Sequence, residues 1–287
     1  MRRLELLINE ARQSTNTTDI NSVSLLLCQA YMNRIHSYME DLLFLVNDEN
    51  DLFLKDFEFN LVPGKDEYDL PVDIYAKSSI DNVAVSFLNG LSQTFLPLKK
   101  VSRKQRGFTF GYFVQEKQIV FTPKPQSPLR IKMTYQRKVP SLGVRIGQIT
   151  SFSANQMIFD EYVANYSDIA DYFTVVSSTG VIKQANIQAS NQVTGQIDTV
   201  TTLSGIAIGD YIICGNFSSS HSQLPDECEK YLITALERMI QYRQSSSDIK
   251  VSDLFSSEEL ATIKEVFADN SYDDAKPPVT EWQEWLP

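Results

Sequence analysis

The sequence lacks the features that several large classes of protein need. It has no run of about 18 apolar residues, the length needed to span a bilayer, and charges interrupt the apolar positions of its first residues, MRRLELLINEARQ, unlike those of a signal peptide. Its three cysteines, Cys28, Cys214 and Cys228, are too few and too far apart for a disulfide framework or a zinc site. We therefore expect a protein assembled in a cytoplasm, with no membrane partner and no metal.

The usual signatures of catalysis and nucleotide binding are also missing. Of the two histidines, His36 fits a partly exposed helix position, and His221 lies in the loop sequence SSSHSQLP with no nucleophile elbow around it. No glycine-rich phosphate-binding motif is present. The acid pairs Glu258–Glu259 and Asp273–Asp274 fall at a helix start and in a tail, where solvated carboxylates are common. We predict no catalytic residue, no cofactor and no enzymatic activity.

What the sequence does have is an uneven distribution of charge. The net charge is −10, yet residues 94–149 contain twelve Lys or Arg against one acid, Glu116, so the remaining residues carry about −21. The basic residues are densest in LPLKKVSRKQRGF, at Lys99, Lys100, Arg103, Lys104 and Arg106. No helix-turn-helix, zinc finger or aromatic RNA-binding signature accompanies them, which argues against sequence-specific nucleic-acid binding. An acidic protein neighbour, nonspecific DNA and a solvated loop remain as interpretations.

Helical periodicity is confined to the two ends of the chain. Apolar residues three or four positions apart predict a helix over residues 1–13 and a second of roughly 28 residues that starts at Asp19, a suitable N-cap. Near the other end, LPDE precedes an apolar stripe that continues to Tyr242, and SSEEL suits the start of a helix that runs from Ser256 or Ser257 to Phe267.

Between the helices the apolar period changes to two. Residues 52–61 alternate, and the following PGKDEYDLP predicts a turn and a return strand, hence a hairpin. Further strands are expected at NVAVSFL, FGYFVQ, QIVFTP and PLRIKMTYQ. Residues 144–217 are rich in Ser, Thr, Asn and Gln, with spaced glycines and short β-branched runs, and predict a small inserted β domain.

These patterns together predict an α+β fold. We expect a helical core, made of the long N-terminal helix and the C-terminal helices, that carries a central β unit over residues 51–138. The core would comprise residues 1–143 and 224–268, the inserted β domain residues 144–217, and an extended C-terminal arm residues 269–287.

The arm contains both tryptophans of the chain, Trp282 and Trp285. Pro277 and Pro278 favour extended backbone before them, and Leu286 follows. An extended segment with spaced aromatic anchors is a known way of docking onto another protein. The alternative is that the tail folds back on its own domain.

Several phrases of the sequence occur in an order shared with a known protein family. LLINEAR is followed by PGKDEYDLPVD, FLPLKKVS, KQIVFTPKPQSPLRIKMTYQRKVPSL and LPDECEKYLITALERMI. This order resembles the head-to-tail connector, or adaptor, proteins of tailed bacteriophages, especially short-tailed ones. The residues that match the family pattern are Tyr68, Leu70, Pro71 and Asp73 directly after a turn, residues 119–125 as a strand leading into Pro-x-Pro, residues 129–135 as a strand ending in Tyr, and Leu224 with Pro225 at the opening of a helix.

The resemblance covers residues 1–142 and 224–268, and typical members lack the insert. It implies a structural virion protein at the head–tail interface, in a ring of commonly twelve copies under the portal. Such a ring extends the DNA channel through which the genome is ejected, and it provides a platform for tail assembly. The implied partners are the portal protein, other copies of the chain, downstream tail or ring proteins and, transiently, DNA.

The resemblance also assigns roles to the two segments singled out above. Family members often dock onto the portal with an extended C-terminal arm, here the segment after Phe267. In a ring, the basic loop would face an acidic neighbour or the DNA channel, and we favour the protein neighbour. Two other classes stay open: a receptor- or glycan-binding tail module that uses the inserted domain, and an enzyme.

Overall fold

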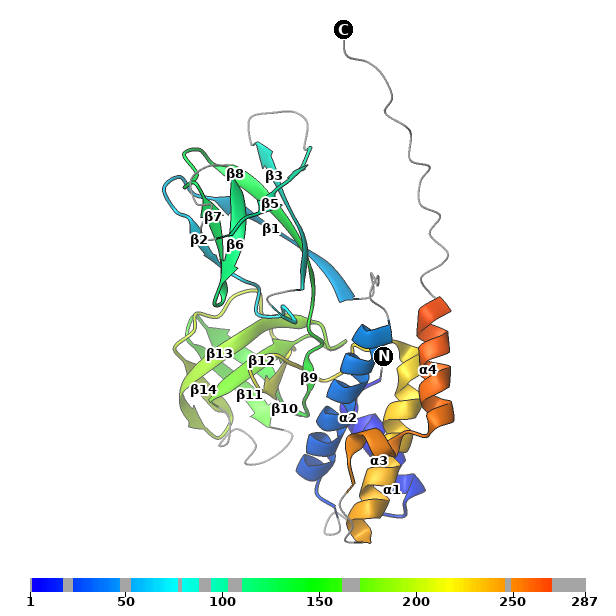
Figure 1. Ribbon diagram of the computed structural model, residues 1–287. Helices are drawn as coiled ribbons and strands as arrows, with labels where there is room; N and C mark the ends of the chain where they lie inside the picture. The colour runs from blue at the N-terminus through cyan, green and yellow to red at the C-terminus, as the bar shows by residue number, and fades with distance from the viewer. Residues whose placement is uncertain are drawn as a thin grey trace. The chain divides into compact units, whose positions relative to one another are not determined.

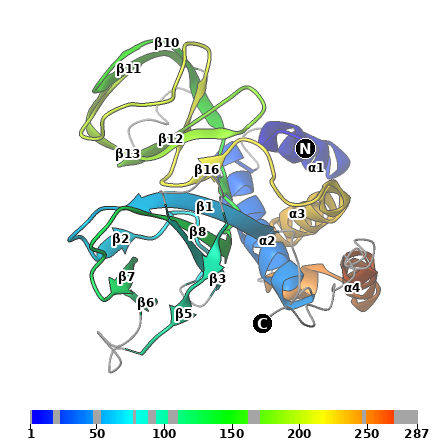
Figure 2. The same ribbon diagram turned by 90° about the horizontal axis from the view of Figure 1, so that it is seen from above.

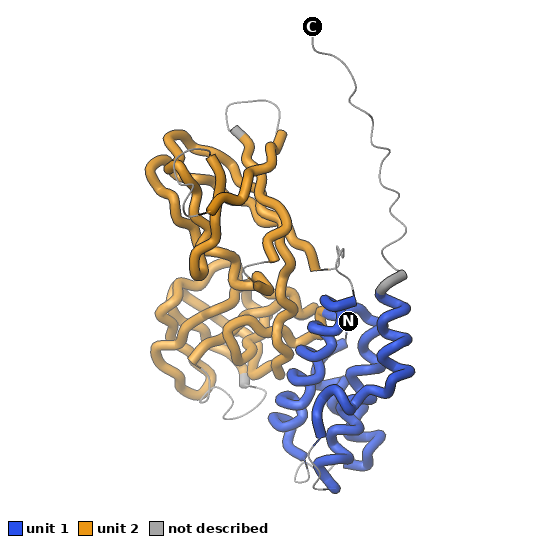
Figure 3. Tube along the Cα trace, in the orientation of Figure 1, with its two compact units in different colours: residues 1–50, 224–287 blue, residues 51–223 orange. Residues whose placement is uncertain are grey.

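The computed structural model describes residues 2–17, 23–46, 53–76, 79–87, 94–102, 110–161, 171–245 and 249–269. The chain divides into two compact units, residues 1–50 with 224–287 and residues 51–223 (Figure 3). In the described ranges, the first unit holds four α-helices and the second holds the strands (Figure 1). The two ends of the chain therefore build one unit, and the β-rich unit is inserted between them.

The expected fold class, an α+β protein around a helical core, was wrong. The structure is mostly β, with 38% strand against 30% helix, and it contains a closed barrel of six strands. The helices have a strong periodic signal, whereas many strands are only two to five residues long and show little periodicity. The division groups residues 51–143 with the barrel.

The helices of the first unit are α1 (Leu4–Ser14), α2 (Leu25–Val46), α3 (Glu229–Gln244) and α4 (Ser257–Asp269), with 3-10 turns at Asp226–Cys228 and Val251–Leu254. Helix α2 has 22 residues, fewer than the 28 expected. Its first turn is capped by Ser24, whose Oγ accepts a hydrogen bond of 3.2 Å from the N–H of Leu27. The cap predicted at Asp19 lies outside the described residues.

These helices bury their apolar stripes against one another. The N–H of Arg2 donates to Glu229 at 2.8 Å, and the hydroxyl of Ser14 bonds the carboxylate of Glu237, so polar contacts join α1 to α3 at two places. The buried residues come from both ends of the chain, among them Leu4, Leu7, Ile8, Met32, Ile35, Met39, Leu232, Leu236, Ile240, Ile263 and Phe267.

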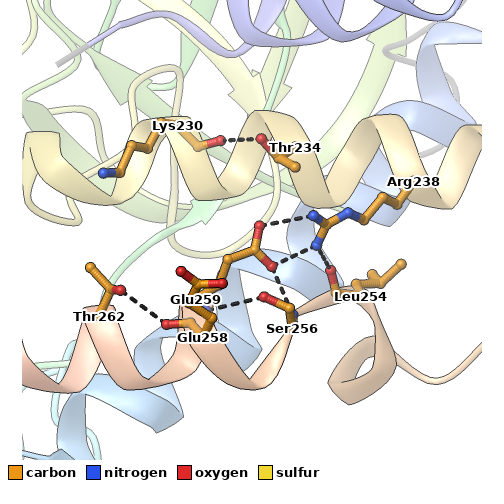
Figure 4. Close-up of polar contacts among 8 residues, drawn as sticks. All are labelled: Lys230, Thr234, Arg238, Leu254, Ser256, Glu258, Glu259 and Thr262. Atoms are coloured by element: carbon orange, nitrogen blue, oxygen red, sulfur yellow. Dashed lines mark hydrogen bonds and ion pairs between the residues drawn. The ribbon is translucent and has the colours of Figure 1, made fainter.

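Helix α4 begins with a cap, as its sequence predicted, and the structure shows that the cap is reciprocal (Figure 4). The Oγ of Ser256 accepts from the N–H of Glu259 at 3.1 Å, and the carboxylate of Glu259 accepts from the N–H of Ser256 at 2.7 Å. Arg238 on α3 donates to both oxygens of the same carboxylate, at 2.7 and 2.9 Å. The start of α4 is thereby fixed to the side of α3.

The first part of the second unit consists of two sheets packed face to face (Figure 2). One has the order β1 (Leu54–Leu61), β8 (Leu129–Gln136), β3 (Ile80–Phe87) and β4 (Leu96–Pro97), and the other has the order β2 (Glu67–Asp69), β7 (Gln118–Thr122), β6 (Gly111–Gln115) and β5 (Lys99–Lys100). The predicted hairpin of residues 52–70 was wrong, because β1 pairs with β8 and β2 pairs with β7 in the other sheet.

A buried polar group lies within the core between these sheets. The hydroxyl of Tyr135, whose side chain is fully buried, donates to Asp73 at 2.6 Å, and the ammonium of Lys55 donates to the other oxygen of Asp73 at 2.6 Å. Burial and the bond to Asp73 raise the pKa of Tyr135, so the phenol keeps its proton. Asp73 thus connects β1 and β8 to the turn in which it lies.

The second part is a closed antiparallel barrel, β10-β11-β14-β13-β12-β15. Its strands are β10 (Arg145–Ser153), β11 (Gln156–Glu161), β12 (Tyr172–Val176), β13 (Ile182–Val193), β14 (Gln196–Thr199) and β15 (Tyr211–Cys214), and they lie within the segment 144–217 for which we predicted a β domain. Apolar residues fill the interior, including Met157, Phe159, Phe173, Ile187, Ile197 and Ile212. Beside the barrel, β9 (Ser141–Leu142) pairs in parallel with β16 (Ser218–Ser219).

Replacing Tyr135 by phenylalanine should destabilise the protein, because Asp73 would remain buried without one of its donors. We expect a loss of about 1–3 kcal/mol, measured by urea unfolding. Thr134→Val is a suitable control, since it removes a hydroxyl that donates to Asp56 at 2.7 Å on the exposed face of the same strand. Equal losses for the two variants would contradict a special role for the buried group.

The contact of Glu259 with Arg238 should make stability depend on acid pH. Hydrogen bonds from Arg238, and then from Ser256, hold the pKa of Glu259 below its usual value of 4.5. The stabilisation is therefore present above the unfolded-state pKa and is lost as pH falls through the lower folded-state value. Glu259→Gln should be less stable than wild type at pH 7, by roughly 1 kcal/mol, and the difference should shrink towards pH 3. Glu258→Gln controls for removing a charge, and a constant difference for Glu259→Gln across pH would refute the assignment.

Candidate functional site

The described part of the basic segment, residues 96–102, lies along an edge shared by both sheets. Strand β4 pairs with β3 at the edge of one sheet, and β5 pairs in parallel with β6 at the edge of the other. The N–H of Leu98 donates to the carbonyl of Val83 at 2.7 Å, and that of Val101 donates to Tyr112 at 2.8 Å. Residues 96–101 therefore cross from one sheet to the other, and the side chains of Lys99 and Lys100 are exposed.

Two features fix this edge strand in place. Val101, directly after it, is buried against Phe113 and Val120. Gly111 on β6 allows the backbones to approach closely, because a Cβ at this position would lie only 2.5 Å from the carbonyl oxygen of Lys99. The two lysines are therefore held on regular structure rather than on a free loop.

Ion pairing distinguishes these lysines from other basic residues nearby in sequence. Lys124 pairs with Asp66 at 3.3 Å, Arg130 with Glu58 at 2.5 Å and Lys132 with Asp56 at 2.7 Å. The contact with Lys132 and a hydrogen bond from Thr134 lower the pKa of Asp56. Lys99 and Lys100 have no acidic partner among the residues that the structure describes. Their charge is available to a partner.

The opposite charge is concentrated in the helical unit. Residues 1–50 and 224–287 contain 10 Lys or Arg and 21 Asp or Glu, a net charge of −11. Residues 94–149 carry +11. One chain therefore has a basic sheet edge and a strongly acidic unit formed by its two ends.

The other predicted site residues cannot be placed in the same way. Arg103, Lys104 and Arg106 of the basic loop lie outside the described residues. The same is true of the arm residues Pro277, Pro278, Trp282, Trp285 and Leu286. Their roles stay predictions.

The two histidines are buried at separate places. His36, expected to be partly exposed, is only 2% exposed, and burial lowers its pKa to about 4. His221 lies against the buried Ser220, with 3.0 Å between Nδ1 and Oγ, and Arg145 donates to the same Oγ at 3.2 Å. An arginine in this position supplies a cation, whereas a catalytic histidine is oriented by a carboxylate. These contacts join β10 to the residues that follow β16.

The cysteines are free thiols in apolar surroundings. Burial raises the pKa of Cys214 and of Cys228 to about 12 and also raises that of Cys28. These thiols stay protonated, and therefore weakly nucleophilic, at neutral pH. Across the described ranges, no group of three or more His, Cys, Asp or Glu side chains is arranged to hold a metal ion.

Polar side chains on the barrel bond to one another. Asp198 accepts from Gln156 at 2.8 Å, from Gln196 at 3.0 Å and from Asn191 at 3.3 Å, and these bonds lower its pKa. An amide that donates to Asp198 has less capacity left for a sugar hydroxyl. The receptor- or glycan-binding alternative for the barrel stays a prediction.

No helix in the described part of the chain has the length and apolar character needed to cross a membrane. Neither a scan of protein-family models nor a search of curated proteins finds a match to this chain.

Proposed function

We propose that this protein is a head-to-tail connector of a tailed bacteriophage, which assembles as a ring below the portal. In that role it joins the capsid to the tail, extends the DNA channel and provides a platform for tail components. The observation that carries the proposal is the exposed Lys99–Lys100 edge, whose lysines have no acidic partner among the described residues, in a chain whose helical unit has a net charge of −11. Ring assembly uses two different surfaces of each copy, one for each neighbour, and these two surfaces have opposite charge.

The sequence resemblance to connector proteins supports the same role. Two residues of the shared pattern form hydrogen bonds within the β unit. Asp73 accepts hydrogen bonds from Tyr135 and Lys55, and the hydroxyl of Tyr68 accepts one from the N–H of Val62 at 2.6 Å. The pattern is thus tied to the packing of the β unit. Chains that share this pattern are therefore expected to share the local fold that these hydrogen bonds stabilise.

An acidic protein surface suits the lysine edge better than DNA does. A channel that bound DNA strongly would slow ejection, and only two unpaired lysines are described on the edge. The barrel adds no cationic surface, since residues 144–223 contain two basic and six acidic residues. The proposed partners are therefore neighbouring copies, the portal protein and downstream tail or ring proteins, with transient nonspecific contact to DNA inside the virion.

Mixing the protein with the portal protein of the same virion tests this function directly. We expect a small species when the protein is alone and a ring-sized complex, near twelve copies, when the portal is present. Sedimentation velocity and mass photometry measure both. The portal protein of an unrelated phage is the control. Failure of the chain to associate with its cognate portal under any salt condition would overturn the proposal.

Reversing the charge of the sheet edge should weaken this assembly. Lys99→Glu with Lys100→Glu replaces attraction to an acidic neighbour by repulsion, and the defect should grow as salt is lowered because screening is reduced. Lys117→Glu is the matched control, since Lys117 is exposed in the turn between β6 and β7. Normal assembly of the double variant with altered DNA retention in filled heads would instead favour a channel-facing edge.

A further inference from the structure

A cleft in the helical unit is separate from the basic edge. Its volume is about 470 Å³, which lies in the range of small-ligand pockets. Arg238, Gln241 and Tyr242 of α3 line one side, and Asp253 and Phe255, which precede α4, line the other. The Lys99–Lys100 edge contains none of these residues.

The cleft is built on fixed side chains. The guanidinium of Arg238 donates to both oxygens of Glu259 and to the carbonyl of Leu254, so its plane is held (Figure 4). The ring of Phe255 stacks on that of Tyr38, with centroids 5.4 Å apart and planes at 21°. Tyr242 is different, because its large ring remains 42% exposed.

This combination fits a flat aromatic group that also has an N–H. A planar guanidinium and an exposed tyrosine ring both stack favourably on an aromatic face. The carboxylate of Asp253 and the amide oxygen of Gln241 can each accept a hydrogen bond. An indole has the required flat face and a single N–H donor.

The chain itself supplies such groups within reach. Its only tryptophans, Trp282 and Trp285, lie in the last six residues. Helix α4 starts beside the cleft and ends at Asp269, 13 residues and about 20 Å away. The residues from 270 to 281 can span up to about 40 Å, twice what the return requires. A tethered segment has an effective concentration in the millimolar range, well above that of other copies in dilute solution.

We propose that, in the free protein, the segment 279–286 docks into the α3–α4 cleft of its own chain through one of its tryptophans. The docked indole covers Tyr242 and cannot contact other proteins while it is docked. Docking stands on the cleft and the sequence alone, whereas release of the arm to the portal rests on the proposed function.

Intrinsic fluorescence tests the docking, because both tryptophans report on the arm. For the whole protein, we expect blue-shifted emission and weaker acrylamide quenching than for a synthetic peptide of residues 270–287. Tyr242→Ala should shift both properties to those of the peptide, while helix content by circular dichroism stays unchanged. Tyr75→Ala is the matched control, since Tyr75 is 38% exposed in the other unit, and it should leave the spectrum unaltered. Trp282→Phe and Trp285→Phe identify the docked ring.

Two outcomes overturn the proposal. Peptide-like emission from the wild-type protein would show that the cleft is not occupied, and emission that shifts red on dilution would assign the cleft to the arm of another copy. Adding portal then separates the two ideas. If the free protein has blue-shifted emission but never binds the portal, the docked arm is supported and the proposed function is refuted. If the protein has peptide-like emission and binds the portal, the proposed function is supported and the docked arm is refuted.

Discussion

The architecture depends on the contacts that bring the first and last residues of each β segment together. The N–H of Arg137 donates to the carbonyl of Phe53 at 2.7 Å, which joins the two ends of the paired sheets. The two ends of the barrel segment are joined in the same way, by bonds from Ser141 to Phe217 and from Gly143 to Ser219. The side chain of Arg137 also donates to Gln223 at 3.0 Å, so residues 53 and 223 meet at the same arginine. Because closing a loop costs little more for a long loop than for a short one, this arrangement lets a large β unit lie between helices that must still pack together.

Local signals in the sequence predict elements well and their partners poorly. The Ser256–Glu259 cap could be found because its residues are three apart and bond to each other. The same holds for β8, whose alternation from Leu129 to Gln136 matches its burial. Pairing is not local: the residues that face β1 are about 75 positions away, and a turn sequence after β1 suggested a hairpin that does not form. The barrel was anticipated only as a polar β segment, because register shifts in β10, β12 and β13 break its alternation.

The same limit applies to the candidate site. Counting charges found the basic island, but only distances separate Lys99 and Lys100 from Arg130 and Lys132, which are neutralised by acids on β1. Acids at alternate positions of one strand and bases at alternate positions of another can form ion pairs when the strands are neighbours. The sequence alone does not show that the two strands are neighbours. The burial of His36 was missed for a related reason, since a polar residue at a helical position gives no sign of which helix will cover it. The cleft beside Tyr242 likewise requires the contact of α3 with residues 253–256, which run from the 3-10 turn Val251–Leu254 to the start of α4.

Weak contacts at the sheet edge have a consequence for assembly. An exposed ion pair contributes about 0.2–1 kcal/mol, and bringing two free molecules together costs about 4–15 kcal/mol. In the proposed ring, two lysines at each contact would therefore not hold free copies together, and a template that holds neighbours side by side would be needed to make the contacts effective. An arm docked on its own chain acts in the same direction. While one tryptophan is covered in the proposed docked state, a copy would have one aromatic anchor fewer to offer to other proteins. In the proposed assembly, transfer to a template would replace one intramolecular contact by one intermolecular contact, so a small difference in free energy per arm would suffice when it is repeated around a closed ring.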